Sequence, residues 1–242
     1  MVPNLTNEQL IRHSRTIALP EIGIEGVMRL MNASALIVGA GALGCITAMY
    51  LAAAGIGRIG IVDFDTVGLS NLQRQLAYTE DDLGRPKVQA LETKLHAVNP
   101  DVRIESYNTV LTHANASELL SHYDIIIEGS DNPATKYLVS DTAYTLRRPC
   151  IIGGVRGFIG QITTQLAEGA TYRDFFPELS EACGFTPCSA TGVLGPVPGL
   201  IASLQATEAI KLLTATGRPL AGRLLQIDTL TMRVSELSEQ SD

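Results

Sequence analysis

Basic residues and cysteine are both scarce in this sequence of 242 residues. The 18 Lys and Arg residues are outnumbered by 25 Asp and Glu residues, which gives a formal net charge of −7 at pH 7. Because nucleic-acid phosphates are bound by clustered Lys and Arg, this balance argues against nucleic acid as the main partner. The 4 cysteines are widely spaced and do not form the pattern of a disulfide framework, so we expect a reducing, cytoplasmic environment.

The chain also lacks an internal repeat, a low-complexity tract and the features of a targeting segment. Residues 1–7 contain no basic region followed by an apolar one, so we expect no signal peptide. Hydrophobic residues make up 45% of the chain, an ordinary share for a folded soluble protein. The length predicts one α/β domain with a sizeable core, and we expect no membrane partner.

The stretch from Ser34 to Asp63 is the most informative part of the sequence. The apolar run 35–38 is followed by Gly-Ala-Gly-Ala-Leu-Gly at 39–44, by a helical pattern of small apolar residues, and by a second apolar run that leads to Asp63. This order predicts a βαβ unit with a G-x-G-x-x-G turn and an acid about 20 residues after it. Backbone N–H groups of such a turn bind phosphate at the positive end of a helix, and the acid binds a ribose hydroxyl. The stretch therefore predicts a nucleotide site.

Two other interpretations fit these residues less well. The glycines could serve tight packing alone, but the complete series of strand, helix, strand and acid favours a nucleotide site. Residues 34–57 carry no charge, as in a membrane span. The repeated glycines, the paired strand that follows them and Arg58 favour a buried sheet instead.

The rest of the sequence predicts an α/β fold, a Rossmann-like mixed sheet with helices on both faces. The expected helices are one that follows the capping box Thr6-x-x-Gln9 and others near 21–31, 45–54, 86–97, 114–120, 134–146 and 194–213, the last of them helical after Pro198. The expected strands are 35–38, 59–62, 102–107, 124–128, 150–152, 158–165, 223–227 and 231–234, and a long loop is expected at 169–188. We divide the single domain, 1–242, into N-terminal helices at 1–32, a nucleotide-binding core at 33–155 and a C-terminal part at 156–242.

Several polar residues follow the expected strands, at the edge where ligands bind in open α/β sheets. They are Asp63, Asn71, Arg74, Lys87 and Asp131. Two cations and an amide beside a glycine turn suit a triphosphate, and a neighbouring carboxylate suits Mg²⁺, which prefers one or two carboxylates together with phosphate oxygens. Arg74 or Lys87 alone would more often be a solvated surface charge, but the position of Asp131 at a strand end favours a site.

Eight motifs occur in order along the chain. The first six are Arg12-x-x-Arg15, the glycine turn, Asp63-Phe64-Asp65, the run from Ser70 to Gln75, Arg85-Pro86-Lys87 and Ser130-Asp131-Asn132. The last two are the runs from Gly192 to Pro196 and from Leu204 to Lys211. Together they resemble the MoeB/ThiF/HesA family over nearly the whole chain, and the run 63–75 is highly specific. Members of this family adenylate the C-terminal glycine of a small ubiquitin-like protein, often a sulfur carrier for thiamine or molybdopterin synthesis. They are relatives of the ubiquitin-activating enzymes and usually form homodimers.

The resemblance implies an adenylyltransferase that uses ATP and Mg²⁺. It also implies a homodimer whose partner is a small ubiquitin-like carrier protein ending in Gly-Gly, bound by the part 156–242. Asp63 would hold the ribose and Asp131 would bind Mg²⁺. The phosphates would be held by Ser70, Asn71, Arg74 and Lys87. The nucleotide site would be completed by Gly39, Gly41, Ala42, Gly44, Gln73 and Asn132. Arg15 would reach into the partner subunit's site, and the expected catalytic residues are then Arg15, Arg74, Lys87 and Asp131.

The chain departs from the family pattern at several positions. Ala42 stands where Gly is usual in the turn, Lys136 where Arg is common, and Thr16 where Gln is common. Many members hold zinc with two Cys-x-x-Cys pairs, but Thr171 and Asp174 occupy the first pair's positions here and no second pair follows. Because structural zinc takes four thiolate or imidazole ligands, we predict that zinc is absent.

The cysteines allow more than one interpretation. Cys183 and Cys188 are a poor substitute for a zinc pair and are more simply two loop cysteines. In some relatives a cysteine at the position of Cys188 joins the carrier through sulfur after adenylation, and a helix N-terminus nearby would lower its pKa. A sulfur relay and a passive loop residue are both open for Cys188. Cys45 and Cys150 fall in a predicted buried helix and strand, so we expect them to be core residues.

Two functions other than adenylation are open to a chain with this βαβ unit. The βαβ unit alone would suit NAD equally well, but no separate substrate domain with a hydride-site acid follows, which counts against an NAD-dependent oxidoreductase. A nucleotide-binding relative that has lost catalysis is the other alternative. The retained Arg15, Arg74, Lys87 and Asp131 count against it.

Overall fold

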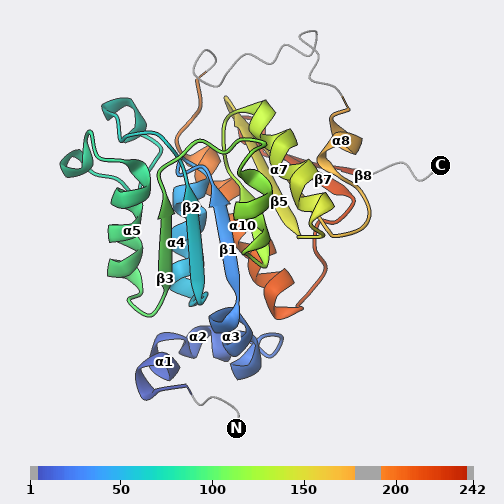
Figure 1. Cartoon of the computed structure of the whole chain (residues 1–242). Helices are drawn as coiled ribbons and strands as arrows, with labels where there is room; N and C mark the ends of the chain where they lie inside the picture. The colour runs from blue at the N-terminus through green and yellow to red at the C-terminus, as the bar shows by residue number, and fades with distance from the viewer. Residues whose placement is uncertain (1–4, 178–191, 239–242) are drawn as a thin grey trace.

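The computed structural model describes residues 5–177 and 192–238, and one mixed sheet runs through them (Figure 1). Its strands are β1 (Ser34–Val38), β2 (Arg58–Val62), β3 (Arg103–Tyr107), β4 (Ile125–Glu128), β5 (Cys150–Arg156), β6 (Ile159–Gln165), β7 (Arg223–Asp228) and β8 (Arg233–Ser238). They lie side by side in the order β3-β2-β1-β4-β5-β6-β7-β8. Neighbours from β3 to β5 are parallel, and neighbours from β5 to β8 are antiparallel. The predicted mixed sheet is confirmed.

Helices cover both faces of the sheet, as the sequence predicted (Figure 1). They are α1 (Asn7–Arg12), α2 (Ser14–Ile17), α3 (Gly23–Asn32), α4 (Gly44–Ala54), α5 (Lys87–Val98), α6 (Ala116–Ser121), α7 (Pro133–Thr145), α8 (Tyr172–Phe175) and α10 (Pro196–Thr214), with short 3-10 helices η1 (Leu69–Asn71) and η2 (Glu80–Asp82). On one face α4 packs against α5 and α10, and on the other α6 packs against α7.

The central strands are buried on both sides. Every residue of β1 and of β4 is buried. Along β1, Ala35 and Ile37 belong to the core cluster under α4, α5 and α10, while Leu36 and Val38 belong to the cluster under α6 and α7. Strands buried on both faces have no polar side to alternate with, and this explains the continuous apolar runs in the sequence.

The strand order changes direction at β1, and the carboxyl ends of β1 and β4 lie side by side there. β1 lies between β2 and β4, so that Ile37 is opposite Ile61 on one side and Ile127 on the other. The chain builds outward from β1 through β2 to β3 and then returns to β4 on the other side of β1. In doubly wound sheets this change of direction is the place where ligands bind.

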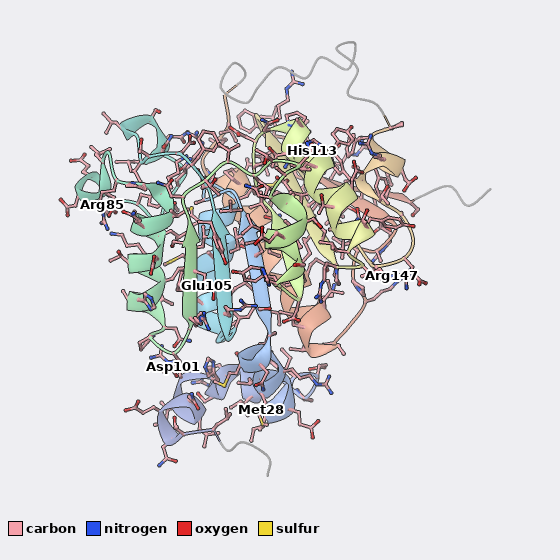
Figure 2. All side chains as sticks on the ribbon, viewed as in Figure 1. Met28, Arg85, Asp101, Glu105, His113 and Arg147 are labelled. Atoms are coloured by element: carbon pink, nitrogen blue, oxygen red, sulfur yellow. The ribbon has the colours of Figure 1, made fainter. Side chains whose placement is uncertain are left out.

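The N-terminal helices lie at the other end of the parallel strands, where β1 begins. The Gln9 side-chain amide donates to a carboxylate oxygen of Asp101 at 3.2 Å, and the Arg12 guanidinium donates to the carbonyl of Val98 at 2.9 Å. Val98 is the last residue of α5, which runs away from the carboxyl edge of the sheet. Figure 1 accordingly shows α1, α2 and α3 below the sheet, and Figure 2 shows Asp101 beside them.

The predicted loop at 169–188 is wrong at its start. Residues Tyr172–Phe175 form the short helix α8, and a capping box stabilises its first turn. The hydroxyl of Thr171 donates to the Asp174 carboxylate at 2.9 Å, and the backbone N–H of Thr171 donates to the same oxygen at 2.6 Å. Thr171 and Asp174, which the resemblance places at the first zinc-binding pair, therefore cap a helix N-terminus here.

Several further predicted boundaries are wrong. β5 runs to Arg156 rather than to Ile152, and the first predicted helix is interrupted at His13, between α1 and α2. Helix α10 begins at Pro196 rather than after Pro198, because a proline in the first helical turn loses no hydrogen bond that the helix requires. β8 begins at Arg233 rather than at Thr231, whose hydroxyl instead donates to the Asp228 carboxylate at 2.8 Å in the β7–β8 turn. Among the described helices, none is both long and apolar enough to cross a bilayer.

Candidate functional site

The glycine turn between β1 and α4 lies at the carboxyl end of β1, beside the end of β4. Gly39 has a φ of +90°, and a Cβ there would lie 3.1 Å from the backbone N and Cα of Ser130. A Cβ at Gly44 would overlap the carbonyl oxygen of Gly39. Glycine is therefore required at both positions, because the turn must pass close to the end of β4 and to its own helix. The first N–H groups of α4 consequently face the carboxyl edge of the sheet.

Asp63 closes the turn from the neighbouring strand. One carboxylate oxygen accepts the backbone N–H of Ala40 at 2.6 Å, and the other accepts the N–H of Asp65 at 2.8 Å. Its side chain is partly exposed. A carboxylate has about four acceptor sites, so these two bonds orient Asp63 and leave capacity for a ligand hydroxyl.

The loop after Asp63 brings two cations to the same edge. The Lys87 ammonium pairs with the Asp65 carboxylate at 2.8 Å, and the Lys87 side chain is only 6% exposed. The Arg74 guanidinium donates to the carbonyl of Ser70 at 2.9 Å, and Asn71 accepts the N–H of Gly68 at 3.0 Å. The loop is folded on itself, and Lys87 is fixed more tightly than Arg74.

Gln75 belongs to the 70–75 motif, but the sequence analysis assigned it no role. Its side chain is 4% exposed, and its amide oxygen is buried without a hydrogen-bond partner in the described chain. A Cβ placed on Gly41 would meet only the Gln75 amide nitrogen, at 3.8 Å. A polar ligand bound beside Gly41 would supply the hydrogen-bond donor that this buried amide oxygen lacks.

Asp131 lies on the turn that follows β4. Its carboxylate is exposed and makes no hydrogen bond or ion pair with residues in the described ranges. Asn132 caps α7, since its side-chain oxygen accepts the N–H of Ala134 at 2.9 Å. The 129–132 turn therefore carries one carboxylate that is free to bind a ligand. This turn lies directly beside the glycine turn, because the backbone of Gly39 packs against that of Ser130.

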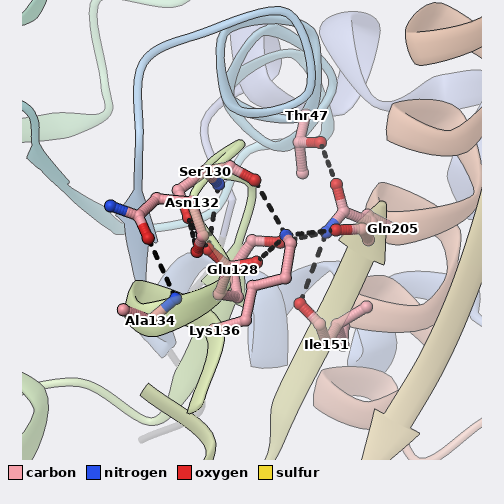
Figure 3. A network of polar contacts seen from close by, with 9 residues as sticks. Thr47, Glu128, Ser130, Asn132, Ala134, Lys136, Ile151 and Gln205 are labelled. Atoms are coloured by element: carbon pink, nitrogen blue, oxygen red, sulfur yellow. Dashed lines mark hydrogen bonds and ion pairs between the residues drawn. The ribbon is translucent and has the colours of Figure 1, made fainter. Parts of the chain in front are cut away.

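Two buried charges lie under this turn, and sequence reasoning assigned neither of them a role (Figure 3). Glu128 is fully buried, and it forms an ion pair with Lys136, which is 5% exposed. Burial raises the pKa of Glu128, and the Lys136 ammonium and the hydrogen bonds from Ser130 oppose that rise. A buried charge at the end of an apolar strand needs a partner of opposite charge. Lys136, eight residues after Glu128, was the feature of the sequence from which this ion pair could have been predicted.

The structure brings all of the predicted nucleotide-binding residues to the carboxyl end of the parallel strands. The residues at this edge are Gly39, Gly41, Ala42, Gly44, Asp63, Ser70, Asn71, Gln73, Arg74, Lys87, Asp131 and Asn132. Gln73 links the loop to the C-terminal part, because a Cβ on Gly195 would meet the Gln73 carbonyl at 2.5 Å. Arg15 is exposed on α2, at the opposite edge of the sheet, so it does not join the site of its own chain.

The cysteines divide into two groups. Cys45 and Cys150 are fully buried, and burial raises the pKa of the Cys45 thiol to about 11 and also raises that of Cys150. Neither is suited to be a nucleophile, and the prediction that both are core residues is confirmed. Cys183 and Cys188 lie outside the described residues.

The residues present fit a nucleotide with a divalent cation. The glycine turn supplies backbone donors, Lys87 and Arg74 supply positive charge, and Asp131 supplies a free carboxylate for Mg²⁺. Within the described ranges no three His, Cys, Asp or Glu side chains gather as a metal site, so such an ion would depend on phosphate oxygens for its other ligands. The absence of zinc stays a prediction.

Solved structures share the fold of this chain. E. coli MccB with ATP aligns with a TM-score of 0.83 at 22% identity, over 96% of this chain and 72% of that chain. PaaA aligns with a TM-score of 0.83 at 23% identity, over 100% of this chain and 77% of that chain. At these identities the likeness shows the architecture alone.

The family model described as the ThiF family matches residues 13–242. The chain belongs to the ThiF family. This confirms the resemblance found in the motifs, and the match begins at His13 and extends to the last residue of this ThiF-family chain.

Curated relatives are similar over almost the whole chain. A Thermus thermophilus protein named sulfur carrier protein adenylyltransferase is 42% identical over 96% of this chain and 88% of its own length. Anopheles gambiae adenylyltransferase and sulfurtransferase MOCS3 is 43% identical over 94% of this chain and 52% of its own length. A probable adenylyltransferase/sulfurtransferase MoeZ of Mycobacterium tuberculosis is 42% identical over 98% and 62%. The chain thus covers most of the first relative and little more than half of the other two.

Proposed function

We propose that this ThiF-family chain adenylates the C-terminal glycine of a small ubiquitin-like sulfur-carrier protein with ATP. The observation that carries the proposal is the free Asp131 carboxylate beside the glycine turn and the buried Lys87, in a chain 42% identical to a sulfur carrier protein adenylyltransferase over 96% of its length. Thiamine, molybdopterin or a related sulfur-containing product would be the end of such a pathway.

The reaction is a displacement at phosphorus. An oxygen of the carrier's terminal carboxylate attacks the α-phosphorus of ATP, a new carboxyl–phosphorus bond forms, and the bond to the β-phosphate breaks. The products are the carrier acyl-adenylate and pyrophosphate. Negative charge grows on the phosphate oxygens, so positioning and electrostatic stabilisation account for most of the catalysis.

Each polar residue of the site has a role in that step. Asp63, already oriented by two backbone N–H groups, binds a ribose hydroxyl. Lys87 and Arg74 bind the phosphates and stabilise the charge that develops on the departing pyrophosphate. Asp131 holds Mg²⁺, and the metal when bound neutralises charge on the phosphates. No protein nucleophile is required for adenylation.

We further propose that the carrier binds to the part 156–242. Exposed apolar side chains lie on the antiparallel strands and the segment before α10, at the end of the sheet where β5 terminates, namely Phe158, Ile159, Leu194 and Val234. β8 is the last strand of the sheet, and its outer edge pairs with no other strand in the described chain. A small protein with an apolar surface could cover these residues while its C-terminal tail extends to Asp131.

The position of Arg15 supports the homodimer proposal. In the described chain Arg15 is exposed at the edge of the sheet opposite to Asp131. Arg15 can contribute to catalysis only if it comes from a second subunit, as in the family. We therefore propose a two-fold homodimer in which each Arg15 completes the site of the other subunit.

The direct test is mass spectrometry of the carrier. A candidate carrier that copurifies with the protein and ends in Gly-Gly is incubated with the protein, ATP and Mg²⁺. The carrier should gain one adenylyl group, and a carrier without its last glycine should not. In parallel, calorimetry should show ATP binding. Tight NAD binding without ATP binding would favour the oxidoreductase, and ATP binding without carrier modification would favour an inactive relative.

A further inference from the structure

The Glu128–Lys136 pair lies under the turn that carries Asp131 (Figure 3). Glu128 is the last residue of β4, and Lys136 lies in the first turns of α7. The turn between them, 129–132, includes Asp131. Both charged groups are buried inside the protein.

The Lys136 ammonium has three N–H donors, and each has an acceptor. One pairs with the Glu128 carboxylate. The second donates to the carbonyl of Ser130 at 2.8 Å, and the third donates to the carbonyl of Gly153 on β5 at 2.6 Å. Lys136 therefore ties three segments to one point: the end of β4, the turn that follows it, and the neighbouring strand.

The Glu128 carboxylate holds the same turn from its other side. It accepts the backbone N–H of Ser130 at 2.9 Å and also the Ser130 hydroxyl. The carbonyl of Glu128 in turn accepts the Gln205 amide of α10 at 2.8 Å, and Gln205 is fully buried. Both polar backbone atoms of Ser130 are thus bound by one buried ion pair, and Ser130 directly precedes Asp131.

A purely structural role does not explain this arrangement well. Buried ion pairs are weak contributors to stability because the desolvation of both charges offsets their attraction, and apolar replacements of equal volume are often as stable. What the pair does provide is a fixed backbone at Ser130. Gly39 packs closely against Ser130, since a Cβ built on Gly39 would lie 3.1 Å from the Ser130 backbone. A fixed Ser130 backbone therefore also restricts where the glycine turn can lie.

We propose that Lys136, held by Glu128, is a positioning residue that fixes the 129–132 turn so that Asp131 meets the metal and phosphates in one geometry. The inference rests on the proposed ATP and Mg²⁺ site. Residues that orient a metal ligand without touching the metal affect metal affinity, and their loss typically costs about 10–100-fold. The effect of Lys136 should accordingly appear as a change in Mg²⁺ dependence.

The experiment compares Lys136→Met, Lys136→Arg and Ser140→Ala with the wild-type chain. Ser140 is a matched control, because it lies one helical turn further along α7, is equally buried and makes a 2.6 Å hydrogen bond to Gln165, away from the turn. Isothermal calorimetry measures ATP binding without carrier at several Mg²⁺ concentrations, so that no turnover is needed. Thermal unfolding is recorded for each variant.

Lys136→Met should need about 10–100-fold more Mg²⁺ for half-maximal enhancement of ATP binding. Lys136→Arg, which keeps the charge and the donors, should restore most of the wild-type Mg²⁺ response. Ser140→Ala should unfold at a lower temperature and keep the wild-type response. If Lys136→Met keeps the wild-type response, or if Ser140→Ala loses it equally, the positioning role is wrong.

A second variant covers the case in which the single change prevents folding. Glu128→Gln with Lys136→Met removes both charges, so no unpaired charge is buried. This double variant should fold and still need more Mg²⁺, because the carbonyl of Ser130 no longer accepts a hydrogen bond from the Lys136 ammonium. A wild-type response in the folded double variant would overturn the inference. Failure of the proposed nucleotide site is a separate result, since wild-type protein would then not bind ATP at all. Failure of carrier adenylation alone is seen in the carrier assay and leaves this ATP-binding comparison intact.

Discussion

Asp82 illustrates at the scale of one residue how the loop before Lys87 is fixed. Its side chain is 2% exposed and pairs with Arg85 at 2.8 Å and with Lys94 at 2.9 Å. It also accepts the backbone N–H of Thr79 at 3.0 Å and the Thr79 hydroxyl at 3.1 Å. Burial acts to raise the pKa of Asp82, but the hydrogen bonds from Lys94 and Thr79 outweigh it and hold the pKa below its usual value.

This lowered pKa predicts how stability depends on pH. Because the folded chain holds Asp82 ionised, its contribution is complete above the unfolded pKa of about 4 and is lost as the pH falls through the lower folded value. Asp82→Asn should lower the free energy of unfolding at pH 7 by about 1–3 kcal/mol. It should also reduce the loss of stability between about pH 5 and pH 3.

Urea unfolding followed by circular dichroism at each pH measures both effects. Asp81→Asn is the matched control, because Asp81 is the exposed neighbour of Asp82 in η2. Asp81→Asn should leave the unfolding curve almost unchanged. An equal loss of stability in the two variants would mean that the ion pairs of Asp82 contribute little.

Residues of the site were predictable where strand ends determine their position. Asp63 and Asp131 each follow a buried strand, and parallel strands place their carboxyl ends together. The pairings of Glu128 with Lys136 and of Lys87 with Asp65 were not predictable, because they depend on how α7 and the 64–87 loop pack. A sequence pattern shows which charge is present but not which partner it meets.

At the scale of elements, the glycine turn supports the next prediction. Gly39 combines a φ of +90° with backbone atoms of Ser130 only 3.1 Å from a Cβ position. Gly23 has a φ of +59°, and a Cβ built on it would have no atom within 4 Å. A Cβ at a positive φ costs about 1–2 kcal/mol at either position, but only at Gly39 must the neighbouring turn move.

Gly39→Ala should therefore weaken ATP binding by about tenfold or more, equivalent to at least about 1.4 kcal/mol. Gly23→Ala should lower the unfolding temperature by a similar amount and leave ATP binding unchanged. Calorimetric titration with ATP, together with thermal unfolding, separates the two effects. Unchanged ATP binding in Gly39→Ala would show that the turn is not part of the nucleotide site.

Most elements were predictable from their patterns, and the errors have physical reasons. The buried strands are continuous apolar runs, and the helix α4 follows from small residues after a glycine turn. The helix α8 was missed because four residues are too few to show a helical period, although its capping box was readable. β8 was misplaced because its residues are exposed throughout and show no apolar alternation.

At the scale of the whole molecule, the proposed dimer predicts complementation between two inactive variants. Arg15→Ala and Asp131→Ala should each lose nearly all adenylation. When the two are mixed and their subunits exchange at random, half of the dimers are mixed, and each mixed dimer has one intact site. About a quarter of the wild-type activity per chain should then return, for a two-fold dimer with shared sites.

Subunit exchange is verified by native mass spectrometry before the assay. No recovery despite complete exchange would place Arg15 outside the partner subunit's site. A control mixture of Asp131→Ala with Lys87→Ala should stay inactive, because both residues belong to the same edge of one chain and the mixed dimer then has no intact site.

The central claim is that this chain activates a carrier carboxylate at the edge of the sheet that holds Asp131. Exchange of radiolabelled pyrophosphate into ATP measures that step alone, before any sulfur transfer. The wild-type protein should show exchange only with Mg²⁺ and a carrier ending in Gly-Gly, and Asp131→Asn should reduce it by about 100-fold or more. If a Gly-Gly carrier that binds the protein supports no exchange, or if Asp131→Asn exchanges as fast as wild type, the account is contradicted.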